Sequence, residues 1–198
     1  MIVQAVKPTY ATEELLALPE SKDYELVDGT LVERHVSVLS SLVGGRLHRL
    51  LGNFAEEHNL AWVWPADNGI QCFPGHPNKV RKPDVSLVRQ ERCTPELLQQ
   101  GYLRIAPDLA VEVISPNDLA EDLDGKITEY QEAGIALIWI VNPPFRTVRV
   151  YRPNTAPVLL HENDELRAED LLPGFHCRVG DLFPPQPAPE QADPAGEK

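Results

Sequence analysis

The stretch that decides the fold class is residues 109–114, which read Leu-Ala-Val-Glu-Val-Ile. A run this apolar is typical of a strand that other elements cover on both faces. Residues 136–141, Ala-Leu-Ile-Trp-Ile-Val, form a second such run, and a segment that ends near Gly134 and has helical spacing separates the two. Strand, helix and strand in this order predict an α/β domain.

Outward from this unit, the sequence predicts further elements of both kinds. Residues 24–27 and 30–33 flank Asp28-Gly29, a dipeptide that favours a two-residue hairpin turn. Leucine, valine and phenylalanine side chains recur every three or four residues over 39–54 and predict a long helix. Further strands are expected at 61–64, 69–73, 84–88 and 147–151. We therefore expect a mixed β-sheet flanked by helices.

Length and composition indicate an ordinary globular protein. The chain has 198 residues, of which 42% are apolar and 24% charged, so we expect one domain over residues 1–183. Residues 184–198 are rich in proline and acidic, and predict a disordered tail. The longest apolar run, 135–141, is too short to span a membrane. With no export signal at the start and three cysteines without a CxxC pair, we expect a cytoplasmic protein.

The charge is strongly acidic overall but unevenly distributed. A net charge of −12 argues against sequence-independent adhesion to nucleic acid, because phosphates would be repelled. Residues 34–104, however, carry nine Lys or Arg against six Asp or Glu. A locally basic face therefore remains compatible with the composition.

Two acidic residues stand where carboxylates are unusual. Glu112 lies in the middle of the first apolar strand, where an unpaired charge is costly to bury, and Asp84 opens another strand directly after Pro83. Carboxylates on adjacent strands can share one divalent cation, which offsets their repulsion. The alternatives are that Glu112 faces solvent from an edge strand and that Asp84 binds backbone amides at the strand entry.

Lys126 is the third residue of this candidate site. In the helix before Gly134 it falls within the apolar stripe formed by Leu119, Leu123, Ile127, Tyr130 and Ala133. Its side chain either extends outward to solvent or directs its ammonium at buried anions such as Glu112. Two carboxylates and a lysine are the groups used in metal-assisted phosphodiester cleavage.

At this point a family resemblance becomes specific. The chain is similar to the Uma-two family of restriction endonucleases, within the PD-(D/E)XK nuclease superfamily, from about Thr12 to Phe183. Four motifs in order carry the resemblance: Tyr-Glu-Leu-Val-Asp-Gly at 24–29, Arg-Lys-Pro-Asp-Val at 81–85, Pro-Asp-Leu-Ala-Val-Glu-Val-Ile-Ser-Pro at 107–116 and Trp-Ile-Val-Asn-Pro at 139–143.

The resemblance implies a restriction-endonuclease-like core. Our leading hypothesis is a nuclease that cuts DNA with Mg²⁺ or Mn²⁺ and forms a homodimer. Asp84 and Glu112 would bind the metal ion together with the backbone carbonyl of Val113. Glu25 would be an upstream acid close to the ion.

One position departs from the superfamily pattern. The superfamily has a lysine two residues after the second acid, and this chain has Ile114 there. Lys126 fits the role of a lysine that has moved to the next helix and positions the attacking water. Tyr130, one turn further on, would line the same cleft.

Three other basic residues are candidates for contacts with phosphate. Arg46 lies in the stripe of the long helix, and Arg81 and Lys82 stand beside Asp84. Arg46 could instead extend to solvent, and the other two could belong to a solvated loop.

Two further functions compete with the nuclease. A catalytically degenerate nuclease fold acting as a binding module is favoured by the acidic net charge and by Ile114. A glycosidase using Glu112 and Asp84 would require exposed aromatic residues near the acids, and the sequence has no aromatic cluster beside either of them.

Overall fold

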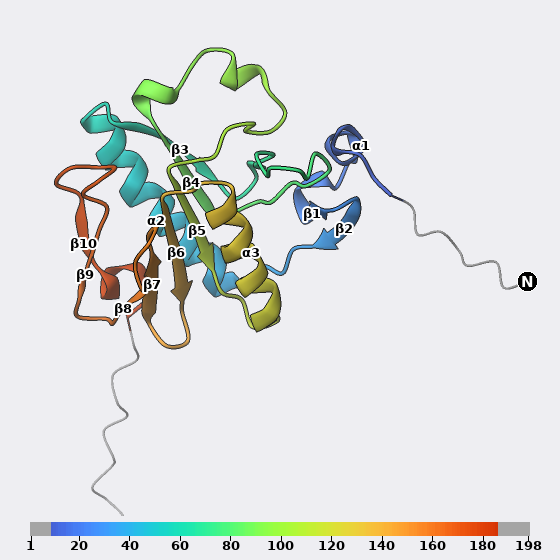
Figure 1. Cartoon of the computed structure of the whole chain (residues 1–198). Helices are drawn as coiled ribbons and strands as arrows, with labels where there is room; N and C mark the ends of the chain where they lie inside the picture. Colours follow the sequence, from blue (N-terminus) through green and yellow to red (C-terminus); the bar gives the residue numbers. More distant parts are fainter. Residues whose placement is uncertain (1–8, 186–198) are drawn as a thin grey trace, which may run out of the picture.

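The computed structural model describes residues 9–185. The tail predicted from residue 184 lies outside the described residues, apart from its first two positions. Three α-helices and ten strands occur among the described residues, with short 3-10 helices between them (Figure 1). They are α1 (Thr12–Ala17), β1 (Tyr24–Val27), β2 (Thr30–Glu33), α2 (Val38–Glu57), β3 (Ala61–Pro65), β4 (Val85–Arg89), β5 (Leu109–Val113), α3 (Ala120–Glu132), β6 (Leu137–Asn142), β7 (Thr147–Tyr151), β8 (Val158–Leu160), β9 (Glu165–Arg167) and β10 (His176–Arg178).

The main sheet is mixed, as predicted. Its six strands follow the order β3-β4-β5-β6-β7-β8. β5 and β6 are parallel and are joined by α3, whereas the other neighbours are antiparallel. The predicted α/β fold with a mixed sheet flanked by helices is therefore confirmed.

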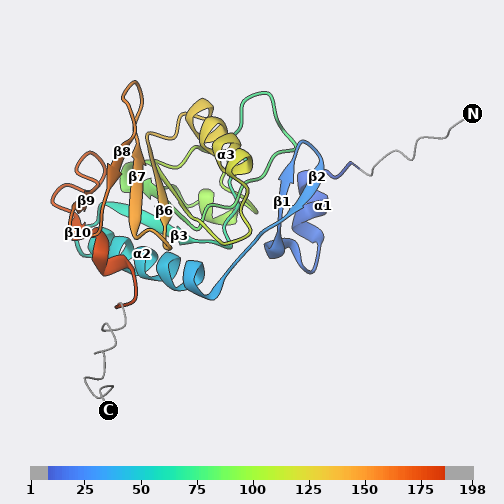
Figure 2. The ribbon, with the colours of Figure 1, turned by 90° about the horizontal axis from the view of Figure 1, so that it is seen from below.

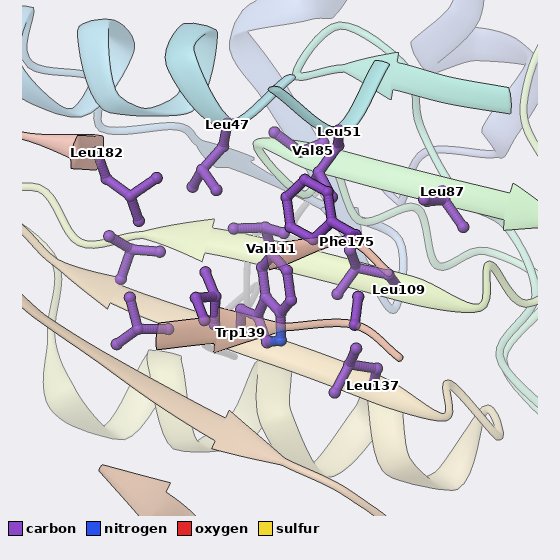
Figure 3. Packing of buried hydrophobic residues seen from close by; sticks show 14 of the residues in the cluster. Leu47, Leu51, Val85, Leu87, Leu109, Val111, Leu137, Trp139, Phe175 and Leu182 are labelled. Carbon is purple, nitrogen blue, oxygen red and sulfur yellow. The ribbon is translucent and has the colours of Figure 1, made fainter. Parts of the chain in front are cut away.

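Helices cover the sheet on opposite faces. In Figure 2, α2 lies on one side of the strands and α3 on the other. Alternation along β5 directs Leu109, Val111 and Val113 into the core beneath α2, which also includes Leu47 and Leu51 (Figure 3). Phe175 and Leu182, from the C-terminal segment, pack into the same core. The intervening positions of β5 face α3, and Glu112 is one of them.

The β1–β2 hairpin lies outside the main sheet and packs through a small core of its own. Asp28 and Gly29 form its turn with φ angles of 48° and 82°, the left-handed pair that a two-residue hairpin turn requires. Leu26 pairs with Val80 in an isolated bridge, and both are fully buried. This bridge holds the hairpin, and with it Glu25, against the segment that leads into β4.

The prediction of a strand at 69–73 is wrong. Only Ile70 pairs there, through isolated bridges to Arg81 and Leu103. The segment begins with Gly69 and is followed by Pro74, so the pairing does not extend. β8, β9 and β10 have three residues each, too few for an alternating pattern to be recognised in the sequence.

No helix among residues 9–185 is both long and apolar enough to cross a membrane.

Candidate active site

Glu112 projects from the centre of the sheet toward α3 and is 8% exposed. The Tyr130 hydroxyl donates a hydrogen bond of 2.5 Å to Glu112 Oε1, and the Lys126 ammonium lies 3.2 Å from Oε2. Lys126 and Tyr130 are four residues apart on α3 and therefore share one helix face. The strand–helix–strand connection thus places two hydrogen-bond donors of α3, Lys126 and Tyr130, against the buried Glu112 carboxylate.

Asp84 lies beside Glu112 because of the sheet register. β4 and β5 pair with Val85 opposite Val111, and continuing this antiparallel register places Asp84 opposite Glu112. Asp84 Oδ2 accepts a hydrogen bond of 2.7 Å from the Val113 amide. Asp84 therefore binds a backbone amide, which was the alternative that the sequence left open, and it also lies next to the second acid, Glu112. Burial, followed by the negative charge of Glu112, raises the pKa of Asp84 to about 7.

Glu25 is the most enclosed acid of the site, at 2% exposure. It accepts hydrogen bonds from Arg81 Nη1 at 3.0 Å and from the Lys82 amide at 2.8 Å. Its Oε1 also lies 3.1 Å from the Lys126 ammonium. Burial raises the pKa of Glu25, but the charges of Lys126 and Arg81 outweigh it and hold the pKa below its usual value.

Lys126 therefore sits between two buried acids. Burial disfavours its charge, yet the charges of Glu112 and Glu25 more than compensate and raise its pKa above the usual lysine value. The group is an ammonium at neutral pH, so it can donate hydrogen bonds and offset negative charge but cannot act as a base.

Two residues expected to hold phosphate are already engaged by the protein. Arg81 contacts Glu25, and its Nε lies 2.6 Å from Glu129 Oε2. The Lys82 ammonium donates to the Ser21 carbonyl at 2.5 Å. Both residues line the cleft, and their charged groups also stabilise the junction of hairpin and sheet. A contact with phosphate stays a prediction for each of them.

Arg46 is not brought to this cleft. It is half-buried on α2 and is not among the residues that line the cleft. Gly44, on which a Cβ would lie 3.7 Å from the Asp84 Cβ, is two residues earlier on α2. Two residues turn an α-helix by about 200°, so Arg46 faces away from the site.

A cleft of about 180 Å³ joins these groups. Glu25, Asp84, Glu112, Val113 and Lys126, which the sequence singled out, all line it. Tyr130 lies behind its wall, fully buried.

Arg34 also lines the cleft and was missed from the sequence. It lies in the linker between β2 and α2, and its Nη2 is 3.5 Å from Asp84 Oδ1. A linker residue has no periodicity to indicate its direction. The one feature of the sequence that could have indicated its role is that Arg34 directly follows the hairpin that carries Glu25.

Comparison with known proteins now defines the family. The sequence model of the Uma2 family, described as "Putative restriction endonuclease", matches residues 12–180, well over half of the chain. The chain belongs to the Uma2 family. The resemblance drawn from the four motifs is therefore confirmed, and with it membership of a family described as nucleases.

A solved structure shares the Uma2 chain's fold. It is described as "a putative nuclease belonging to DUF820 from Anabaena variabilis ATCC 29413". The likeness has a TM-score of 0.74 at 21% identity and covers 88% of this chain and 97% of that one. Comparison with curated proteins gives no significant match.

Restriction-endonuclease-like families generally use divalent metal ions, and the donors in this Uma2 chain fit one. No group of three or more His, Cys, Asp or Glu side chains between residues 9 and 185 is arranged to hold a metal. Mg²⁺, however, is usually held by one or two carboxylates, with water and substrate phosphate completing its shell. Asp84 and Glu112 are oxygen donors; burial and, after it, the negative charge of Glu112 raise the pKa of Asp84, and a divalent cation would offset that charge.

Proposed function

We propose that this chain is an endonuclease that hydrolyses DNA phosphodiester bonds with Mg²⁺ or Mn²⁺. The observation that carries the proposal is the position of Lys126, whose ammonium lies 3.1 Å from Glu25 and 3.2 Å from Glu112, with Asp84 lining the same cleft. Membership of the Uma2 family supports nuclease chemistry at this site.

The roles follow from the chemistry of each group. Asp84 and Glu112, with the backbone carbonyl of Val113, would hold the metal ion. When bound, the ion supplies a Lewis acid that offsets charge on the scissile phosphate. Lys126 would orient the attacking water and stabilise the negative charge that develops in the transition state.

Glu25 and Tyr130 would hold two of these groups in position. Glu25 holds the Lys126 ammonium from the hairpin side, and Tyr130 holds the Glu112 carboxylate from α3. Each therefore fixes a group that the reaction uses, as preorganisation of an active site requires. Both belong to the proposed site as positioning residues.

Nicking of supercoiled plasmid DNA in Mg²⁺ or Mn²⁺ tests the proposal. Asp84→Asn and Lys126→Gln should each lower the nicking rate by about 100-fold or more, since the first weakens the hold on the metal ion and the second removes a cation that stabilises the transition state. Glu121→Gln is the matched control, because Glu121 lies on the exposed face of the same helix; it should cut at the wild-type rate. Lys126→Arg keeps the positive charge. It is the control for the possibility that Lys126→Gln loses activity only because it fails to fold.

Equal cutting by wild type, Asp84→Asn and Lys126→Gln would end this assignment. A wild-type chain that binds DNA without cutting it in either metal would instead favour the binding module. Light scattering of the purified chain would test the proposed homodimer.

A further inference from the structure

A second hollow, of about 450 Å³, adjoins the cleft on the other side of Asp84. Arg34 and Asp84 line both spaces, so they form the junction between them. The remaining walls come from the first half of α2, the short helix Ser21–Asp23 and the loop after β3. The proposed catalytic carboxylate is therefore reached from two sides.

Two adjacent glycines on α2 keep this hollow open. A Cβ on Gly44 would lie 3.7 Å from the Asp84 Cβ, so the helix passes close to the carboxylate. A Cβ on Gly45 would meet no atom within 4 Å. Glycine lowers the stability of a helix interior relative to alanine, and here the pair leaves space next to the site.

Among the described residues, Arg34 is the cation that lines both spaces. Lys126 and Arg81 lie 3.0 to 3.2 Å from the buried acids Glu25 and Glu112. Arg34 pairs with Asp84 at the longer distance of 3.5 Å and donates to the Lys22 carbonyl at 3.2 Å. A metal ion on Asp84 would take over the neutralisation of that carboxylate and leave the guanidinium free for an anion.

The walls of the hollow carry polar groups suited to a nucleobase. The side chains of Lys22, Asp23, Ser41, His48 and Asp67 form no hydrogen bond or ion pair to another residue between 9 and 185. Carboxylates accept hydrogen bonds from exocyclic amino groups of bases, and hydroxyl and imidazole groups bond to base edges. The volume also falls within the range of small-molecule sites.

We infer that the second hollow is a subsite for the nucleotide next to the scissile phosphate, and that Arg34 binds a phosphate at its entrance. This inference rests on the proposed nuclease function. A paired base cannot leave its stack to enter the hollow without unpairing. The preferred substrate is therefore single-stranded DNA or DNA with an unpaired nucleotide at the cleavage position.

Two glycine variants of α2 test the subsite. Gly45→Trp fills the hollow, whereas Gly52→Trp, on the same helix and also without an atom within 4 Å of its Cβ, lines neither space. Binding of a fluorescein-labelled single-stranded 12-mer is measured by anisotropy in EDTA, which prevents cutting. Gly45→Trp should weaken binding at least tenfold, while Gly52→Trp should stay within twofold of wild type.

The salt dependence of binding tests Arg34 separately. It is measured in Mg²⁺, so that the metal ion can release Arg34 from Asp84, and every protein in this series carries Lys126→Gln to suppress cutting. Loss of one phosphate contact to a single strand lowers the slope of log Kd against log salt concentration by about 0.7. Arg34→Gln should show this decrease and Arg34→Lys should not, a difference that a merely structural role would not produce. An unchanged slope in Arg34→Gln would overturn the phosphate contact.

The possible failures are distinguishable. Equal Kd values for the two tryptophan variants, with plasmid nicking by wild type intact, would overturn the subsite alone. Wild-type protein that neither binds nor cuts any nucleic acid would overturn both the subsite and the nuclease. Equal Kd values for the 12-mer and its duplex would overturn the preference for unpaired DNA.

Discussion

At the level of single residues, the site depends on one ammonium shared by two acids that come from different parts of the chain. Lys126 neutralises Glu25 from the hairpin and Glu112 from the sheet. The negative charge of Asp84 is less fully neutralised, since its ion-pair partner Arg34 lies 3.5 Å away. Asp84 is consequently the acid whose protonation responds to pH near neutrality.

The pH dependence of stability should report on Asp84. Its pKa is about 7 in the folded protein against 3.8 ordinarily, so the folded state holds a proton that the unfolded state has released between these values. The resulting stabilisation is complete below about pH 4 and is lost as pH rises through 7, at about 1.4 kcal/mol per pH unit at most. In EDTA, the free energy of urea unfolding should therefore fall by about 2 kcal/mol more from pH 5 to pH 7.5 in wild type than in Asp84→Asn.

Comparison of the two proteins cancels the groups that titrate in both. Parallel pH profiles for wild type and Asp84→Asn would contradict the raised pKa. Saturating Mn²⁺ should suppress the loss in wild type, because the ion favours the ionised carboxylate.

At the level of elements, the segment between β3 and β4 aligns the hairpin with the sheet. It carries Arg81 and Lys82 to Glu25, and the Ile70–Arg81 bridge closes it. Gly69 lies in this segment at a point of close approach. A Cβ there would lie 2.6 Å from Tyr102 Cδ1 and 2.8 Å from Val80 Cγ1.

Gly69→Ala should destabilise the protein by about 1–3 kcal/mol, because both neighbouring side chains are buried and cannot move freely. Gly125→Ala is the matched control. It lies inside α3 with no atom within 4 Å of its Cβ, and should stabilise by about 0.5–1 kcal/mol. Urea unfolding of both variants gives the comparison, and similar free energies for the two would show that the segment is more adaptable than its packing indicates.

At the level of the whole molecule, a metal site couples ion binding to the stability of the fold. A ligand that binds only the folded state stabilises it by about 2.7 kcal/mol at 100 times its Kd. Thermal melting with Mn²⁺ should therefore give a higher Tm than melting in EDTA, and the increase should disappear in Asp84→Asn. A wild-type Tm that does not respond to Mn²⁺ or Mg²⁺ would favour the catalytically degenerate alternative.

Local signals in the sequence were sufficient for the longer elements and for most of the site, although they wrongly placed a strand at 69–73 and did not reveal β8, β9 and β10. The Asp28-Gly29 turn, the apolar runs around Glu112 and the helical stripe containing Lys126 each depend on residues close together in the chain. Such patterns are set by backbone geometry, so they can be recognised without knowing the partners. They predicted the mixed sheet, and they singled out the acids and the lysine that the cleft brings together.

The ion-pair partners could not be derived in this way. Arg81 and Lys82 looked free to grip phosphate, yet they bind Glu25, Glu129 and the Ser21 carbonyl. Arg34 was not singled out from the sequence, yet its guanidinium lies 3.5 Å from the Asp84 carboxylate. Which charge meets which depends on distances of a few ångström between segments far apart in the chain, because electrostatic and hydrogen-bond energies fall steeply with separation. Those distances exist only after the hairpin, the sheet and α3 have packed together.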